Sequence, residues 1–334
     1  MEKKRVALVL SSGGPRGFAY IGALEELEAR GYEITSIAGT SIGSLVGGIY
    51  ASGRLGEFKE WLFALDNWEV FKLIDFSLSR NHLVKGEKII EAIKGIVPDI
   101  KIENLPIPYC AIATDLYTGR EVVFDKGHLF EAIRASISIP SLFRPVEYGK
   151  MLLIDGGVSN CLPLNRVKRT EGDILVAFSV YGVDSEAIEQ AVESMVVGEL
   201  EYERLKARKM GELEQVASDV SRNAELSFLS KVKALGVKGW EVLNSIRQFR
   251  DAAPKEELSD IGGSFYDVMD RSTSIMNHHA TQLALKVTPP DVLVSMSFDE
   301  HSEMSDYANA KLTAERGREL MAEALDRYEA GLKG

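Results

Sequence analysis

Two strand–loop–helix units follow each other at the start of the chain, and they restrict its fold more than any other feature. Residues 5–14 read RVALVLSSGG, a short buried strand that leads into a glycine loop, and residues 17–32 then have apolar side chains at helical spacing. A second strand over residues 34–40, ITSIAGT, leads into a second helix that begins SIGSLVGG. Strands joined through a helix in this way form a parallel crossover, so we expect an α/β fold.

The rest of the chain extends this pattern. Five further segments are rich in Val, Ile, Leu or Tyr and are bounded by turn residues, as strands of the same sheet would be. These segments are residues 108–116, 121–125, 151–157, 173–180 and 289–298. Residues 184–286 are charged and show helical periods, and residues 305–330 have the pattern of a closing helix. We therefore predict one α/β domain over residues 5–334 with a helical insertion over residues 184–286.

Charge and composition argue against several function classes. The net charge is −11, whereas nucleic-acid binding usually requires a basic face, so we expect no nucleic-acid partner. The two cysteines, Cys110 and Cys161, provide neither a disulfide framework nor a CxxC metal site. No apolar run approaches the roughly 20 residues of a membrane span. The short run Val6–Leu10 ends in a glycine loop rather than a cleavage site, so we expect a cytoplasmic protein.

A serine lies between two glycines at the start of the second helix. Gly39, Ser41 and Gly43 form the pattern G-x-S-x-G between a predicted strand and a predicted helix. A nucleophile elbow holds its serine on such a tight turn, and small flanking residues let strand and helix approach each other. The helix N-terminus favours negative charge that develops beside Ser41. The alternative is an ordinary turn in which Ser41 caps the helix.

The glycine loop SSGGPRGF, residues 11–18, precedes the first helix. It lacks the first glycine of a dinucleotide fingerprint and the acidic residue about 20 positions further on, and it lacks the Gly-Lys-Ser/Thr of a phosphate loop. It fits an oxyanion hole whose donors are the backbone amides of Gly13, Gly14 and Arg16, because Pro15 has no N–H. The alternative is a glycine turn with an exposed arginine. Both this loop and Ser41 follow neighbouring parallel strands, so both are expected at the carboxyl edge of the sheet.

A nucleophilic serine needs a base, and the five histidines lie in no recognisable catalytic phrase. In MLLIDGGVSNCLPL, Asp155 ends a predicted strand and is expected at the same carboxyl edge. Gly156 and Gly157 then let the backbone turn close to the site. A carboxylate whose pKa is raised by partial desolvation can act as the general base without a histidine. The alternative is a common Asp-Gly turn.

The phrases GGPRG, GTSIG and DGG, taken together and in this order, resemble the patatin-like phospholipase family. RASISIPSLFRPV, residues 134–146, adds a fourth match, and the resemblance covers residues 5–181. It implies a three-layer sandwich, in which a mostly parallel sheet has helices on both faces. The sequence departs from the family at Ser12, where the family's glycine loop usually begins with glycine.

The resemblance also implies an activity. Members of the family are acyl hydrolases that use a Ser–Asp dyad, which would be Ser41 and Asp155, with an oxyanion hole in the loop of residues 13–17, Gly17 included. The implied partner is a lipid or fatty-acyl ester, and no cofactor or metal is expected. Arg16 either binds a lipid phosphate or braces the loop. The insertion either forms a lid that contacts a membrane surface or only covers the sheet.

Two other interpretations stay open at this point. One is an α/β-hydrolase triad, in which Ser41 and Asp155 act with His278, His279 or His301. The other is a lipid-binding protein without activity. The sequence does not indicate the oligomeric state or the natural ester.

Overall fold

The computed structural model describes residues 4–65, 85–183, 265–298 and 309–331, with a few isolated positions between them. The chain divides into two compact units, residues 1–183 with 270–334 and residues 184–269. The first unit contains the sheet and the candidate site. Most of the second unit, and with it most of the predicted insertion over residues 184–286, lies outside the described residues. Residues 270–286 of that prediction belong to the first unit.

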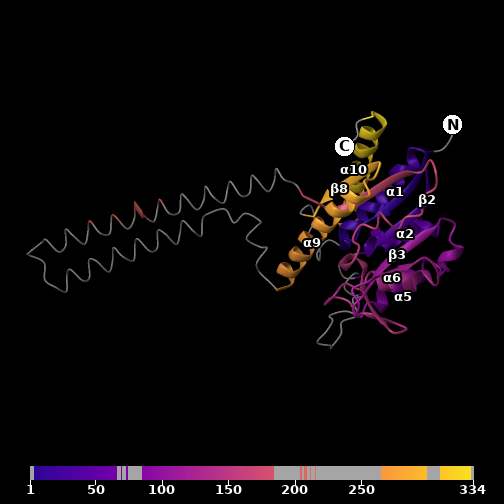
Figure 1. The fold of residues 1–334 in the computed structure, drawn as a ribbon, viewed down its shortest axis with the longest axis horizontal. Coiled ribbons are helices and arrows are strands. Elements are labelled where there is room, and N and C mark those ends of the chain that lie inside the picture. The colour runs from indigo at the N-terminus through magenta and orange to yellow at the C-terminus, as the bar shows by residue number, and fades with distance from the viewer. Residues whose placement is uncertain are drawn as a thin grey trace, which may run out of the picture. The chain divides into compact units, whose positions relative to one another are not determined.

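A single mixed sheet contains the eight strands of the described residues (Figure 1). They are β1 (Lys4–Leu10), β2 (Tyr32–Thr40), β3 (Tyr109–Asp115), β4 (Glu121–Phe124), β5 (Val146–Tyr148), β6 (Met151–Asp155), β7 (Ile174–Gly182) and β8 (Val292–Ser297). The order is β5-β6-β3-β2-β1-β7-β8, and β4 pairs with β3. The pairs β2–β3, β1–β2, β1–β7 and β7–β8 are parallel, whereas β4 and β6 pair antiparallel to β3. The predicted α/β class and all seven predicted strands are confirmed, and the three-residue β5 is additional.

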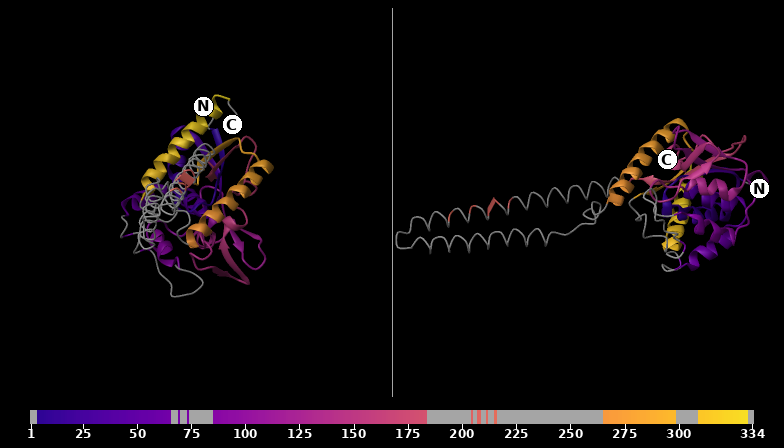
Figure 2. Two further views of the ribbon diagram at one scale, coloured as in Figure 1. Left: turned by 90° about the vertical axis from the view of Figure 1, so that its left-hand side faces the viewer. Right: turned by 90° about the horizontal axis from the view of Figure 1, so that it is seen from below.

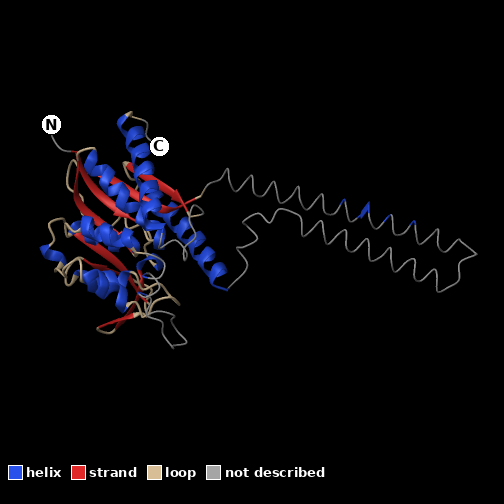
Figure 3. Cartoon of the chain, turned by 180° about the vertical axis from the view of Figure 1, so that it is seen from behind, coloured by secondary structure: helices blue, strands red, loops and turns tan. Residues whose placement is uncertain are grey.

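Helices lie on both faces of this sheet, as Figure 2 and the secondary-structure colouring of Figure 3 show. The α-helices of the described residues are α1 (Ala19–Ala29), α2 (Ile42–Ala51), α3 (Leu55–Ala64), α5 (Glu87–Lys94), α6 (Leu129–Ser136), α9 (Phe265–Val287) and α10 (Ala310–Glu329). Three short 3₁₀ turns are η1 (Gly14–Phe18), η2 (Ile102–Asn104) and η3 (Gly156–Val158). Figure 2 places α9 and α10 on opposite sides of the strands, so the predicted three-layer arrangement is confirmed.

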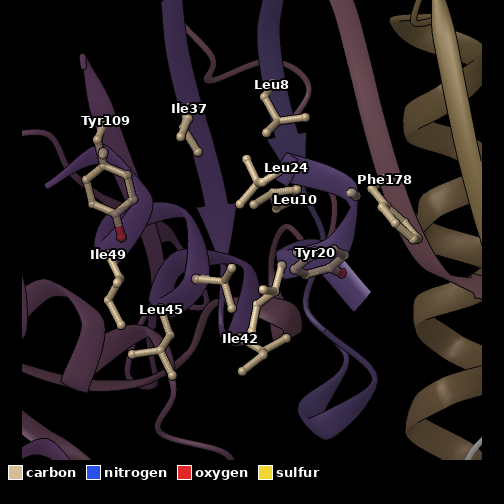
Figure 4. Close-up of a cluster of buried hydrophobic side chains, with 14 of the residues drawn as sticks. Leu8, Leu10, Tyr20, Leu24, Ile37, Ile42, Leu45, Ile49, Tyr109 and Phe178 are labelled. Carbon is tan, nitrogen blue, oxygen red and sulfur yellow. The ribbon is translucent and has the colours of Figure 1, made fainter. Parts of the chain in front are cut away.

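Alternate residues of the central strands pack the two faces, because successive side chains of a strand point in opposite directions. In β1 the larger core contains Val6, Leu8 and Leu10, and the smaller core contains Ala7 and Val9. Figure 4 shows the side chains of Leu8 and Leu10 in the larger core, next to that of Leu24 from α1. The smaller core is closed by Ala284 and Leu285 of α9. A strand buried on both faces explains why residues 6–10 are continuously apolar.

Helices α1 and α10 approach each other closely enough for their backbones to touch. A Cβ atom placed on Gly22 of α1 would lie 1.8 Å from the carbonyl oxygen of Ala314. A Cβ atom on Gly317 of α10 would lie 1.9 Å from the carbonyl oxygen of Ala19. The two glycines are therefore required by the packing of the C-terminal helix onto the first βα unit.

We expect Gly317→Ala to lower the free energy of unfolding by about 1–3 kcal/mol, because the new methyl group forces the two helices apart. Urea unfolding of the variant and of wild type measures this difference. Gly56→Ala in α3 is the matched control, since its Cβ would meet nothing within 4 Å, and it should change stability by less than about 1 kcal/mol. Equal effects of the two substitutions would contradict the packing argument.

Candidate active site

Ser41 occupies a strained turn between β2 and α2. Its backbone angles are φ 54° and ψ −122°, and the residue is 3% exposed. Such a conformation costs a residue other than glycine about 1–3 kcal/mol, so it persists only where the surrounding structure imposes it. The flanking glycines allow the close approach: a Cβ on Gly39 would lie 2.3 Å from the Gly43 oxygen, and one on Gly43 would lie 2.4 Å from the Leu10 oxygen.

The register of the sheet brings Asp155 to this turn. Strand β2 pairs with β3 as far as Thr40, which lies opposite Ile112. Strand β6 begins its antiparallel pairing at the next position of β3, where Asp155 lies opposite Ala113. Strand β4 pairs with a stretch of β3 that overlaps both the stretch paired with β2 and the stretch paired with β6. Strand β4 therefore occupies one edge of β3, and β2 and β6 lie end to end along the other edge. Asp155 thus ends a strand beside Ser41, as the sequence indicated, but β6 runs in the direction opposite to β2.

A short hydrogen bond joins the two residues. The Ser41 Oγ donates to Asp155 Oδ2 at 2.5 Å, and the backbone N–H of Gly157 donates to Asp155 Oδ1 at 2.7 Å. Burial raises the pKa of Asp155 to about 6, and the bonds from Ser41 and Gly157 oppose part of that rise. Above pH 6 the arrangement therefore places a poorly solvated carboxylate on a serine hydroxyl, which is the geometry of proton transfer from serine.

The aspartate turn continues as the short turn η3. A Cβ on Gly156 would lie 2.2 Å from the Ile112 oxygen, so only glycine lets the chain turn directly over β3. A Cβ on Gly157 would lie 2.9 Å from the Ser12 Oγ, which places the aspartate turn beside the glycine loop.

The glycine loop packs against the serine turn. Gly13 has φ 147°, a conformation that residues with a side chain rarely adopt. A Cβ on Gly17 would lie 2.2 Å from a methyl carbon of Ile42, the residue after Ser41. Within the described residues, the amides of Gly13 and Gly14 bond to no acceptor. Free amides at a helix start beside a serine can receive an anionic oxygen.

Arg16 braces this loop and is not an exposed arginine. Its side chain is buried, with 1% of the residue exposed. The guanidinium donates to the carbonyl oxygens of Gly13 at 3.2 Å and Phe298 at 2.8 Å, and to Ser274 Oγ at 3.4 Å. Because these bonds are directed into the protein, bracing of the loop describes Arg16 better than phosphate binding.

Two serines of α6 and the turn after it complete the site, and sequence reasoning gave them no role. The backbone N–H of Ser41 donates to Ser136 Oγ at 2.8 Å, and that hydroxyl donates to the Ile112 oxygen at 2.5 Å. The backbone N–H of Asp155 donates to the Ser138 oxygen at 2.9 Å. Both serines belong to the sequence phrase RASISIP, which the family resemblance includes. No rule of sequence spacing connects them to Ser41 or Asp155.

The histidines do not join this pair of residues in the described part of the chain. His278 Nδ1 bonds to the Tyr181 carbonyl oxygen at 2.7 Å, and neither it nor His279 bonds to Asp155. His301 lies outside the described residues. Within the same ranges, no group of three or more His, Cys, Asp or Glu side chains could hold a metal ion, and no helix is long and apolar enough to cross a membrane.

Comparison with known proteins identifies the family to which this chain belongs. Residues 8–167 match the patatin-like phospholipase family, and that range contains both Ser41 and Asp155. An NTE family protein of Mycobacterium tuberculosis is 34% identical over 337 residues, which cover 97% of this chain and 92% of the relative. The chain therefore belongs to the NTE family. The resemblance and the enzyme class expected from the sequence, a patatin-like lipid acyl hydrolase, are confirmed.

Other similarities cover less of the chain or are weaker. The lysophospholipase NTE1 of the yeast Debaryomyces hansenii is 31% identical over 189 residues, which cover 55% of this chain and 12% of that protein. Among solved structures, VipD from Legionella pneumophila gives a TM-score of 0.44 at 14% identity, over 98% of this chain and 67% of VipD. A TM-score this low carries no conclusion about fold or function.

The raised pKa of Asp155 predicts a pH-dependent stability. A carboxyl whose pKa rises from 3.8 to about 6 on folding holds its proton more tightly in the folded state, so stability falls as the pH rises through this window. The loss amounts to about 3 kcal/mol. Asp155→Asn has no carboxyl to titrate. Between pH 3.8 and pH 7 we therefore expect the unfolding free energy of the variant to rise by about 3 kcal/mol relative to that of wild type. Urea unfolding at both pH values measures it, and parallel curves for the two proteins would contradict the assignment.

Proposed function

We propose that this protein is a serine acyl hydrolase that cleaves carboxylic esters of lipids through a dyad of Ser41 and Asp155. The observation that carries the proposal is the 2.5 Å hydrogen bond from Ser41 Oγ to a buried carboxylate, made on a strained turn at a helix start. Burial that raises the pKa of Asp155 to about 6 gives this carboxylate a proton affinity suited to a general base near neutral pH.

In the acylation step, Ser41 Oγ attacks the ester carbonyl carbon while its proton passes to Asp155 Oδ2. The carbonyl π electrons move to the oxygen, and the amides of Gly13 and Gly14, with those of Arg16 and Gly17 at the end of the loop, form the proposed oxyanion hole. Losing one good donor to such an oxygen typically costs about 3–4 kcal/mol of transition-state stabilisation. The tetrahedral intermediate then expels the alcohol oxygen, which takes the proton from Asp155 and leaves an acyl group on Ser41.

Deacylation repeats these steps with water. A water molecule gives a proton to Asp155 as its oxygen attacks the acyl carbon. Collapse of the second tetrahedral intermediate breaks the bond to Ser41 Oγ, which regains the proton from Asp155. The products are a free fatty acid and the original enzyme, and every step uses groups of this chain and water alone.

The substrate class follows from the family. Patatin-like phospholipases and the fungal lysophospholipase NTE1 are named for the hydrolysis of phospholipid or lysophospholipid esters, so we propose an ester of the same kind for this chain. We also propose that the protein is cytoplasmic and meets its lipid at a membrane surface without spanning it. A lid formed by the predicted insertion over residues 184–286 stays a prediction, since residues 184–264 lie almost entirely outside the described residues.

Two alternatives remain distinguishable from this proposal. A triad would require His278, His279 or His301 as the base, and the first two make no bond to Asp155 among the described residues. A non-catalytic lipid-binding protein would not need the strained turn at Ser41 or the buried Asp155. Both features are costly to stability, which favours a catalytic use.

Loss of either member of the proposed dyad should abolish hydrolysis. We expect Ser41→Ala and Asp155→Asn to lower kcat by at least about a thousandfold on p-nitrophenyl esters and on lysophosphatidylcholine. Ser52→Ala at the end of α2 and Asp173→Asn before β7 make the same chemical changes at buried positions outside the site and should keep wild-type kcat. Turnover that survives in Ser41→Ala, or a wild type that neither hydrolyses these esters nor reacts with a fluorophosphonate, would refute the proposal.

The pH dependence of catalysis should report the base. Because Asp155 must be deprotonated to accept the Ser41 proton, kcat/KM should rise with pH and reach a plateau above an apparent pKa of about 6. A histidine base would give a similar curve, so the profile is compared with those of His278→Gln, His279→Gln and His301→Gln. Each of these should retain more than a tenth of wild-type kcat/KM, and abolition by any one of them would replace the dyad with a triad.

A further inference from the structure

Ser12, the position at which the glycine loop departs from the family's usual glycine, carries a side chain that the structure uses. Its Oγ lies 3.0 Å from the Tyr181 Oη, and its backbone N–H donates to the Cys161 oxygen at 2.9 Å. The residue is 3% exposed, and its Oγ is next to Gly157 of the aspartate turn. A glycine here would leave the loop without any side-chain bond at this point.

Tyr181 is in turn held by α9. Asn277 Nδ2 donates to Tyr181 Oη at 2.9 Å, and His278 Nδ1 bonds to the Tyr181 carbonyl oxygen at 2.7 Å. Since Asn277 supplies a proton to the phenol oxygen, the phenol proton is left for Ser12. Burial raises the pKa of Tyr181 to about 12, so this hydroxyl remains a donor throughout the working pH range. Ser12, Tyr181 and Asn277 thus form a continuous buried chain of hydrogen bonds, which we call the loop clamp.

A second link connects the same loop to the same helix. Arg16 lies at the other end of the loop, and its guanidinium contacts Ser274 of α9 and lies 5.4 Å from the centre of the Tyr181 ring. Ser274 and Asn277 are three residues apart, so they lie on one face of α9, and both are buried. Buried polar groups that are bonded in this way restrict the position of the backbone that carries them.

We propose that the loop clamp positions the glycine loop for acyl transfer, so that catalysis at Ser41 depends on Tyr181 and on Asn277 of α9. This inference rests on the proposed function, because it assigns these residues to the geometry of the proposed oxyanion hole. They are positioning residues: Tyr181 and Asn277 act on the amides of Gly13 and Gly14 through Ser12. Displacement of catalytic groups by a fraction of an ångström slows a reaction without weakening substrate binding in proportion.

Steady-state kinetics on a p-nitrophenyl ester test the loop clamp. We expect Tyr181→Phe to lower kcat about tenfold and to change KM less than about twofold. Ser12→Gly, which restores the residue usual in the family, should lower kcat by a similar factor. Because Tyr181 acts through Ser12, adding Tyr181→Phe to Ser12→Gly should cause no further loss. If the phenol acted independently of Ser12, Tyr181→Phe would instead lower kcat by the same factor in wild type and in Ser12→Gly.

Tyr32→Phe is the matched control. It removes the partly buried hydroxyl of another tyrosine, which bonds to Glu329 at 2.9 Å. Tyr32 lies at the far end of β2, about 30 Å along that strand from Ser41. Tyr32→Phe should alter thermal stability and leave kcat unchanged. Wild-type kcat in Tyr181→Phe, or equal losses in the two backgrounds, would overturn the loop clamp alone. A wild type without Ser41-dependent turnover would overturn the proposed function together with this inference.

Discussion

The meeting of two strands on one edge of β3 is the constraint on which the rest of the site depends. Strand β2 ends opposite Ile112, and β6 ends opposite Ala113. Ser41 follows β2 and Asp155 is the last residue of β6, so the backbone pairing of these strands fixes the positions of both residues. A slip of one residue in this register would turn every side chain of the strand to the other face of the sheet. The proposed dyad would need no third group to orient its base, because the strand and the Gly157 amide already orient the carboxyl group of Asp155.

Holding these two residues together has a cost that the core must offset. Ser41 adopts backbone angles that are unfavourable for a residue with a side chain, and Asp155 is buried without a cationic partner among the described residues. Each feature destabilises the fold by a few kcal/mol. Two apolar layers on the central strands, and the backbone contact of α1 with α10, supply the compensating packing. Strain of this kind is concentrated at functional sites, where a looser turn would lose the geometry.

Sequence reasoning located the parts of the site more reliably than their connections. Ser41 and Asp155 can be identified from the sequence because the turns around them require close backbone approach. This requirement places glycines next to them in a recognisable local pattern. The direction of β6 was not predicted, since apolar alternation is the same in parallel and antiparallel strands. Ser136 received no role because its bond to the Ser41 amide joins residues 95 positions apart, with no spacing rule between them. The sequence does not show whether the Arg16 side chain is exposed or buried, because burial of an arginine depends on carbonyl groups far away in the chain, such as that of Phe298.

The departure at Ser12 concerns the support of the glycine loop and not the proposed pair of Ser41 and Asp155. The amides of Gly13 and Gly14 bond to no acceptor among the described residues, and the side chains of Ser12 and Arg16 hold the loop on either side of them. Arg16 donates to Ser274 of α9, and Ser12 bonds to Tyr181, which accepts a hydrogen bond from Asn277 of α9. Helix α9 therefore supports both ends of the loop, whereas among the described residues it makes no hydrogen bond to Ser41 or Asp155.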